Sequence, residues 1–351
     1  MNAVPSPAYA PGHFVNRDEE IGRVLRKVER LLKGLSPTPP HTAFHGPRGS
    51  GKSWLLHHLR DRVAEKFGDQ ITLLFFSLNP SNRALAEDVL QTACHELGLP
   101  TPPAATLDDL NWWLVDLCQK HPRPIVIIVD ELDKVEPEPL KTLENYFILP
   151  LCRIPCLLLV LGTRVPRPRG RLGDVELKRR TENVELPPFD EKWTREQITA
   201  LGCSPALAPD ILAVGGGYPL SNAILAAGWA TDPGKALQEC AEALLDGVEK
   251  YLHDYFWALC PLDSIDVDRM PPLLAKYFGD LGDPLENWDR QRCHRILMDM
   301  VSTRLVQWER WTPSGYGMDP AVRQVLRSAM QKNQPVLWEN LSQIVSTITP
   351  G

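Results

Sequence analysis

The sequence lacks any apolar run long enough to cross a membrane as a helix, since the longest runs, residues 125–129 and 156–161, have the length of buried strands. None of its eight cysteines forms a C-x-x-C pair, so the spacing of a zinc knuckle is missing. Residues 1–11 have neither a basic start nor an apolar core, so no secretory signal is expected. These absences predict a cytoplasmic chain with reduced thiols and no membrane contact.

The sequence also lacks the excess of basic residues that is typical of nonspecific nucleic-acid binding. It carries 38 Lys and Arg against 44 Asp and Glu, a formal net charge of −6. The last part of the chain, from residue 246, holds 14 acidic and 11 basic residues. This charge balance makes DNA the less favoured partner, although local basic stretches leave DNA binding as an alternative. With 351 residues, the chain is expected to form two to three domains.

Residues 46–53, GPRGSGKS, fit the phosphate-binding loop pattern G-x-x-x-x-G-K-[ST]. Glycines let backbone N–H groups turn inward around a polyphosphate, and the helix that follows directs its positive end at the anion. Lys52 can reach the β- and γ-phosphates, and the Ser53 hydroxyl can bind Mg²⁺. The alternative is a glycine-rich turn before a helix that matches the pattern by chance. We assign nucleotide binding to Gly46, Pro47, Arg48, Gly49, Ser50, Gly51, Lys52, Ser53 and Trp54.

An acidic pair follows the apolar run 125–129. A buried strand delivers such a pair to its carboxyl end, where ligands bind in parallel sheets. Asp130 can hold Mg²⁺ through water, with Ser53 as the other metal ligand, and Glu131 can orient and deprotonate a water for attack on the γ-phosphate. The expected cofactors are ATP or ADP and Mg²⁺, with Glu131 and Lys52 as catalytic residues. The alternative is a strand that merely ends in acidic residues.

Arg164 is the third candidate catalytic residue. It follows the predicted strand 156–162, which is the next strand in order after the acidic one. An arginine at that strand end can sense the γ-phosphate. In the alternative interpretation, Arg164 simply starts the basic stretch 164–180.

Strand and helix patterns alternate through the first half of the chain, which is typical of a parallel sheet covered by helices. After residue 190 the patterns are helical, and two short strands between helices near the end suggest a winged helix. The first predicted helix is capped by Asn16, has Asp18, Glu19 and Glu20 in its first turn and runs through residue 32. The other predicted helices cover 53–67, 83–97, 107–119, 139–148, 194–201, 205–214, 220–229, 235–259, 266–278, 289–301, 321–330 and 336–347. Predicted strands cover 42–45, 71–77, 125–129, 156–162, 184–186, 304–311 and 316–318.

The predicted fold class is therefore α/β: a phosphate-loop nucleotide-binding domain with a parallel AAA+-like sheet, then a small helical domain and a winged-helix domain. We expect a flexible arm at 1–12, the nucleotide-binding domain at 13–190, a helical lid at 191–245 and the winged helix with C-terminal helices at 246–351.

Several segments resemble the STAND-type ATPases and the related origin-recognition AAA+ proteins. Residues 14–21, FVNRDEEI, resemble the F-V-G-R-x-x-E box of these families, and the phosphate loop, the acidic strand and residues 162–164 follow in the family order. Residues 217–219, GYP, resemble the G-x-P motif of the STAND helical domain, and residues 318–326 resemble the end of its winged helix. The resemblance covers residues 14–330.

The resemblance implies an ATP-driven switch in which ADP is held between the three domains and exchange for ATP opens the chain for assembly. By position, it places Asn16 and Arg17 near the adenine and Pro219 near the base or ribose. Asn16 stands where the family has glycine, which puts tight backbone geometry there in question. No repeat array or effector domain follows the winged helix in this sequence, so sensor and effector are expected to be other protein chains.

The first functional hypothesis is thus a slow ATP-hydrolysing switch that controls nucleotide-dependent homo- or hetero-oligomeric assembly with partner proteins, in signalling or defence. The alternative is a DNA-binding AAA+ ATPase of the origin-recognition or transposition-regulator type. It depends on Arg290, Arg292 and Arg295, which lie on the third helix of the predicted winged helix, the element that enters a major groove. A scaffold that only holds nucleotide is a third possibility, and the intact Asp130–Glu131 pair argues against it.

Overall fold

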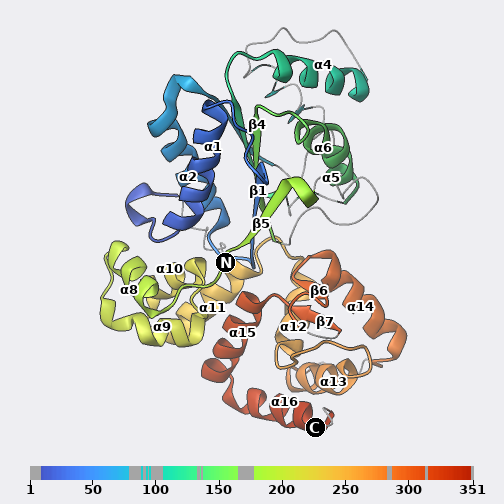
Figure 1. The fold of residues 1–351 in the computed structure, drawn as a ribbon. Helices are drawn as coiled ribbons and strands as arrows, with labels where there is room; N and C mark the ends of the chain where they lie inside the picture. Colours follow the sequence, from blue (N-terminus) through green and yellow to red (C-terminus); the bar gives the residue numbers. More distant parts are fainter. Residues whose placement is uncertain are drawn as a thin grey trace. The chain divides into compact units, whose positions relative to one another are not determined.

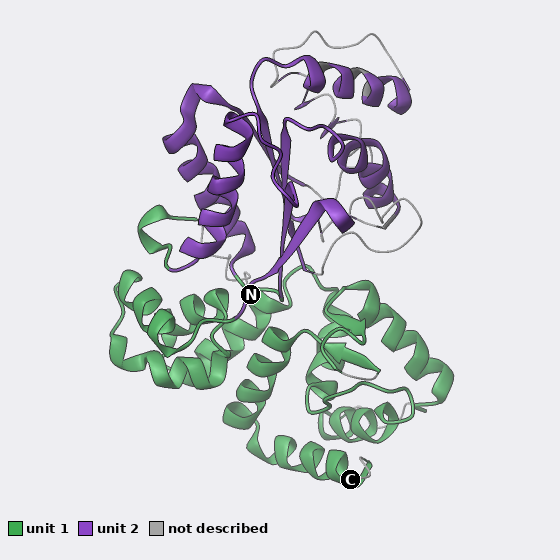
Figure 2. Ribbon diagram, viewed as in Figure 1, with its two compact units in different colours: residues 1–15, 47–50, 188–351 green, residues 16–46, 51–187 purple. Residues whose placement is uncertain are grey.

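The computed structural model describes residues 9–78, 88–89, 92–93, 95, 106–132, 135, 137–164, 178–282, 287–312 and 315–348. The chain divides into two compact units (Figure 2). Unit 2 comprises residues 16–46 and 51–187, and unit 1 comprises residues 1–15, 47–50 and 188–351. Across the described ranges, no helix has the length and apolar character of a membrane span.

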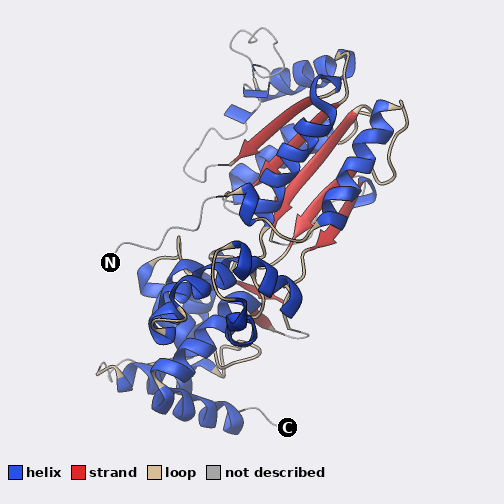
Figure 3. Ribbon diagram, turned by 90° about the vertical axis from the view of Figure 1, so that its left-hand side faces the viewer, coloured by secondary structure: helices blue, strands red, loops and turns tan. Residues whose placement is uncertain are grey.

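Unit 2 is a five-stranded parallel sheet with helices on both faces (Figures 1 and 3). The strand order is β2-β3-β4-β1-β5, so β4 lies between β1 and β3. The strands are β1 (His41–His45), β2 (Thr72–Ser77), β3 (Ile125–Asp130), β4 (Leu157–Thr163) and β5 (Thr181–Glu185). The helices are α1 (Asp18–Leu32), α2 (Lys52–Phe67), η2 (Gly68–Gln70), α4 (Leu107–Lys120), α5 (Pro137–Leu143), the π-helical η4 (Glu144–Ile148) and α6 (Leu149–Leu151).

The side chains of β3 point alternately to the two faces of the sheet, so they contact different helices. Every residue of β3 is buried, as expected for a central strand covered on both faces. Ile125, Ile127 and Val129 join the apolar cluster that includes residues of α4, α5, η4 and α6. Because successive side chains point to opposite faces, Asp130 lies on the other face, where α2 covers the sheet. This alternation places the carboxylate against the helix that follows the phosphate loop.

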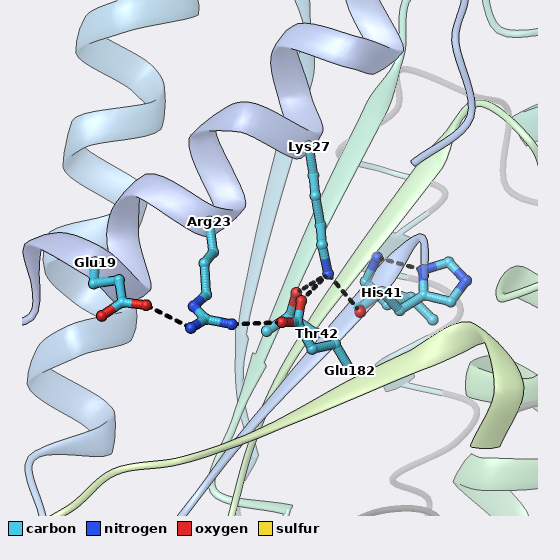
Figure 4. A network of polar contacts seen from close by, with 7 residues as sticks. Glu19, Arg23, Lys27, His41, Thr42 and Glu182 are labelled. Atoms are coloured by element: carbon cyan, nitrogen blue, oxygen red, sulfur yellow. Dashed lines mark hydrogen bonds and ion pairs between the residues drawn. The ribbon is translucent and has the colours of Figure 1, made fainter. Parts of the chain in front are cut away.

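A partly buried charged network connects α1 to the edge strand β5 (Figure 4). The Lys27 ammonium lies 2.8 Å from a carboxylate oxygen of Glu182, and it donates to the Thr42 hydroxyl (2.7 Å) and the His41 carbonyl (2.9 Å). Arg23 contacts the other oxygen of Glu182 at 2.8 Å. Burial lowers the pKa of Lys27, and Glu182 opposes that shift. Burial alone would raise the pKa of Glu182, but Lys27 and Arg23 together lower it.

Unit 1 is mostly helical, and one continuous apolar core runs through it from Ile198 to Leu341. Three helices precede a two-stranded antiparallel hairpin, the order expected of a winged helix. The elements are η1 (Pro11–His13), α8 (Glu191–Ala200), η5 (Pro205–Leu207), α9 (Ala208–Gly215), α10 (Pro219–Gly228), α11 (Pro233–Leu244), α12 (Lys250–Leu259), α13 (Met270–Asp280), α14 (Arg290–Ser302), β6 (Val306–Trp308), β7 (Tyr316–Met318), α15 (Pro320–Asn333) and α16 (Pro335–Ile348).

The predicted long helix at 235–259 is wrong, because the chain breaks it into α11 and α12. Gly247 adopts a left-handed backbone with φ of 78°, which ends helical geometry between the two. The predicted boundary between helical lid and winged helix, at 245/246, falls in this break, and the division into those domains stays a prediction. The strand predicted at 184–186 begins earlier, at Thr181, and most of the helix predicted at 83–97 lies outside the described residues.

We predict that His41 makes unit 2 sensitive to acid. Its Nδ1 accepts the Leu159 N–H (3.1 Å), its Nε2 lies 2.8 Å from the Cys152 carbonyl, and burial lowers its pKa from 6.5 to about 4. As the pH falls from 6.5 toward 4, His41 is protonated in the unfolded chain but stays neutral in the folded one. The free energy of unfolding therefore decreases across this pH range. Between about pH 7 and pH 4.5 this residue contributes a loss of about 2–3 kcal/mol in the free energy of unfolding.

Urea unfolding followed by circular dichroism at both pH values measures this loss. His41→Gln is the matched control, because an amide can keep one donor and one acceptor but does not titrate. An equal pH dependence in the two proteins would contradict the assignment.

Candidate functional site

The phosphate loop lies where the sequence predicts it, between β1 and α2. Gly51 takes a left-handed conformation (φ 88°) just before the helix starts at Lys52, a geometry that favours glycine. Among the described residues, no side chain caps this helix start, so its positive end faces the loop. The Lys52 ammonium donates to the Gly46 carbonyl at 2.9 Å, which folds the side chain back along the loop. Trp54 is half-buried in the first turn of α2.

Asp130 and Ser53, the predicted metal ligands, are hydrogen-bonded to each other in unit 2. Asp130 is buried, with 3% of its surface exposed. Burial raises the pKa of its carboxyl, the neighbouring Glu131 adds to the rise, and the bond from Ser53, the Glu131 N–H and the charge of Lys52 oppose it. The structure therefore brings a hydroxyl and a carboxylate oxygen together beside the phosphate loop's lysine.

Glu131 is held in a fixed position by its backbone and by one side chain. It has a positive φ of 64°, and its N–H donates to the Asp130 carboxylate at 2.7 Å. The Ser77 hydroxyl donates to its carboxylate oxygen Oε2 at 3.1 Å. Sequence reasoning missed Ser77. The available signal was its place at the end of β2, in register with Asp130 at the end of β3.

Gly162 makes room for Asp130. A Cβ at this position of β4 would lie 2.9 Å from the Asp130 oxygen Oδ1 and 2.7 Å from Leu56 of α2. Because β4 runs between β1 and β3, its backbone passes directly beside the carboxylate, and only glycine fits there. Arg164 lies one residue beyond the end of β4, at the same sheet edge, and its role as a γ-phosphate sensor stays a prediction. Residues 165–177 of the basic stretch lie outside the described residues.

The box that resembles the adenine-binding motif has an unusual backbone. Asn16 and Arg17 both have positive φ, 64° and 75°, and asparagine tolerates this left-handed region better than most residues. Asn16 therefore suits a position where the family has glycine. Arg17 is buried, donates to the Pro187 carbonyl at 2.6 Å and pairs with Glu20 at 3.3 Å. Contact of either residue with adenine stays a prediction.

Pro219, the predicted residue near the base or ribose, is the first residue of α10 in unit 1. The preceding Gly217 has a φ of 75°, and a Cβ there would lie 2.1 Å from the Phe189 carbonyl oxygen. The Gln197 side chain donates to the Pro219 carbonyl at 2.9 Å, which fixes the start of the helix.

Unit 1 also includes four residues of the phosphate loop, Pro47, Arg48, Gly49 and Ser50. Within this unit, the Leu220 N–H donates to the Gly49 carbonyl at 3.1 Å.

The third helix of the predicted winged helix, α14, has one exposed and one buried face. Cys293, Ile296, Leu297 and Met300 are buried. The exposed face carries Arg290, Gln291, His294 and Arg295. Arg292, which the sequence grouped with the two exposed arginines, instead stacks on the Trp288 ring at 4.5 Å and bonds to Tyr255. The hairpin that follows presents Trp308, which is 58% exposed. Gln291 and His294 are the members of this face that the sequence reasoning missed.

Similarity to known proteins agrees with this geometry. A family model described as "AAA domain" matches residues 37–164. That segment contains the phosphate loop and the acidic strand. A curated relative, "ORC1-type DNA replication protein 5" from Halobacterium salinarum, is 25% identical over 128 residues, which cover 34% of this chain and 29% of that protein.

Two solved structures share the fold over nearly the whole chain. The Aeropyrum pernix ORC1 protein in complex with DNA has a TM-score of 0.51 at 16% identity, with 98% of this chain and 97% of that chain covered. The Aeropyrum pernix ORC2 protein, described with ADPNP and ADP, has a TM-score of 0.50 at 16% identity, with 95% of each chain covered. The predicted fold class is confirmed: a parallel AAA+ sheet is followed by a helical C-terminal region like that of origin-recognition proteins.

We predict that Gly162→Ala damages unit 2 and its site together. The added methyl group collides with Leu56 and the Asp130 carboxylate, so we expect a loss of about 1–3 kcal/mol in stability. Thermal unfolding measures the loss. Gly279→Ala on α13 is the control, because its Cβ would meet nothing within 4 Å and alanine suits a helix interior. Equal stability of the two variants would show that β4 can accommodate a side chain at this position.

Proposed function

We propose that this protein is a magnesium-dependent ATPase of the AAA+ type that binds duplex DNA through its C-terminal helices, as an origin-recognition protein would. The observation that carries the ATPase part is the grouping of Ser53, Asp130 and Glu131 at one sheet edge in unit 2, next to Lys52. The match of residues 37–164 to the AAA domain supports it independently.

The residues fit a magnesium nucleotide. Ser53 and Asp130 offer oxygen ligands, the donor type that Mg²⁺ prefers, and Lys52 begins a helix whose positive end favours phosphate. Gly49 and Gly51 both have positive φ, so the loop can turn its amides inward without Cβ clashes. Bound Mg²⁺ would neutralise charge that develops on the phosphates.

We assign Glu131 the role of general base. Its carboxylate is oriented by Ser77 and by its own strained backbone, and it lies one residue beyond Asp130, the proposed metal ligand. It would accept a hydrogen bond from the attacking water and take its proton at a carboxylate oxygen. The bond from Ser77 keeps the side chain in one rotamer and so reduces the entropy lost when water is oriented.

The DNA part rests on the exposed face of α14. Two arginines, a glutamine and a histidine lie exposed on that helix, and polar side chains of this kind bind phosphates or base edges in protein–DNA complexes. The solved relative described in complex with DNA and the relative named as a replication protein point to the same class of ligand. This support favours the DNA-binding alternative over the protein-assembly switch that the sequence placed first. A nucleotide-dependent oligomer and partner proteins remain predictions.

We predict that Glu131→Gln binds ATP with unchanged affinity but hydrolyses it about 100-fold more slowly, because an amide cannot take the proton of water. Fluorescence titration with a labelled ATP analogue and phosphate release measure the two quantities. Glu138→Gln on α5, an exposed site 85% open to solvent, is the control for the charge change. Lys52→Ala should lose binding itself. Normal turnover in Glu131→Gln would remove it from the role of base.

We predict that Arg290→Gln combined with Arg295→Gln weakens duplex DNA binding about tenfold at moderate salt. Loss of two cations should also reduce the slope of log affinity against log salt by about 2. Fluorescence anisotropy across a salt series, with ATP present, measures both. Lys235→Gln with Lys332→Gln on α11 and α15 removes the same charge elsewhere and serves as the control. A chain that binds ATP but no duplex would overturn the DNA part and restore the assembly switch.

A further inference from the structure

Unit 2 leaves two large apolar side chains exposed among its described residues. Trp112 on α4 is 76% exposed, and Leu35, just after α1, is 52% exposed. Trp112 lies outside the apolar core, which α4 contacts through Leu114 and Cys118 instead. Tryptophan is enriched in protein interfaces, where one such side chain can carry much of the binding energy. These two positions are therefore candidates for contact with another molecule.

Trp112 lies among carboxylates. Asp108 and Asp116 are four residues before and after it, so the three side chains follow one side of α4, and Asp109 lies beside Asp108 in the first turn. All three aspartates are exposed. The two in the first turn also favour the start of the helix. Lys120 contacts Asp116 at 2.6 Å and offsets one of the three negative charges. We call Asp108, Asp109, Trp112 and Asp116 the acidic face.

Leu35 lies among cations. Its N–H donates to the Arg30 carbonyl at 2.9 Å across Gly34, which has a left-handed backbone, and this turn holds Leu35 beside the end of α1. Arg26, Arg30 and Lys33 are all exposed along that end of the helix. An exposed leucine is thus surrounded by charge of one sign, opposite to the sign around Trp112.

The neighbouring helix α2 adds a further cation. Lys66 contacts the Glu29 carboxylate of α1 at 2.6 Å. It lowers the pKa of Glu29, and the charges of Lys33 and Arg26 add to that shift, so three cations gather around one carboxylate. We call this second surface the basic face, and it consists of Arg26, Arg30, Lys33, Leu35 and Lys66.

The two faces lie on opposite sides of the sheet. Helices α1 and α2 contact β4 on the side where α2 covers Asp130. Helix α4 packs on the other side, in the apolar cluster that contains Ile125 and Ile127 (Figure 1). Because the sheet separates the faces, one copy of the protein cannot bring its acidic face onto its own basic face.

We propose that the acidic face of one copy docks on the basic face of a second copy. Trp112 packs against Leu35 of the second copy at the centre, and the aspartates lie opposite Arg30 and Lys33 of that copy at the rim. Because two different faces meet, each copy keeps one free face, and association can continue to larger assemblies. The contact uses unit 2 alone and depends on neither the ATPase nor the DNA proposal.

Sedimentation velocity over roughly 5 to 200 μM protein tests the contact, since small charged interfaces are typically weak. The wild-type protein should associate with rising concentration, and high salt should weaken this association. Trp112→Ala should associate about tenfold more weakly. Trp308→Ala, which removes an exposed tryptophan from unit 1, should behave as wild type. Thermal unfolding checks that both variants fold.

A wild-type protein that stays monomeric across this range would overturn the proposal and assign the two faces to other partners. Equal association of Trp112→Ala and wild type would show that the copies meet elsewhere.

Reversal of charge tests the pairing of the two faces. Asp108→Lys with Asp116→Lys makes the acidic face basic, and Arg30→Glu with Lys33→Glu makes the basic face acidic. Each variant alone then has two faces of one sign and should lose association. An equimolar mixture should associate again, because every contact between the two variants joins opposite charges.

Glu196→Lys with Glu339→Lys is the control for the first variant, because it reverses two exposed charges on α8 and α16 of unit 1. It should associate as wild type does. Unchanged association of either reversed variant alone, or a mixture that stays monomeric, would overturn the pairing of the acidic and basic faces.

Discussion

The close packing of β4 against the Asp130 carboxylate is the constraint on which the rest of the site depends. With β4 between the strand that leads into the phosphate loop and the strand that ends in acid, the space beside Asp130 is too small for any side chain. Alternation along β3 puts the carboxylate on the face covered by α2, where Ser53 bonds to it, and the absence of a side chain at Gly162 leaves room for it there. Burial then makes the charged form costly unless cations or hydrogen-bond donors offset it, which is the setting in which a bound metal ion is stabilised.

Much of unit 2 could be predicted from the sequence, because its signals are local. The apolar run 125–129 and the glycine pattern 46–51 specify a buried strand and an anion-binding turn by residue type alone. Since parallel strands end at one edge of a sheet, Asp130 and Ser53 were expected to meet. Ser77 was not found, because a serine at a strand end carries no pattern of its own, and only the register of β2 with β3 gives it a partner.

Unit 1 was harder to predict, because its decisive contacts are distant in sequence. No local pattern links Arg48 to Asp319 across 271 residues. α11 ends at Leu244, and the break before α12 contains Gly247 in a left-handed conformation, in a segment whose apolar spacing otherwise predicts a continuous helix. On α14, helical spacing indicates the buried positions. It does not predict the stacking of Arg292 on Trp288, which depends on an aromatic side chain just before the helix.

The core of unit 1 crosses the break at Gly247 without interruption, and polar contacts reinforce it. Gln324, Ser328 and Asn333 of α15 donate to the carbonyl groups of Ala213, Val214 and Gly234, in or beside α9 and α11. Loss of α15 would leave those carbonyls and the apolar faces of α9 and α11 open to water. Helices α8 to α11 therefore depend on α15 for their folding. A chain that ends after α12 would be expected to lose α9 and α11 as well, and with them the contacts of α11 with residues 47–50 of the phosphate loop.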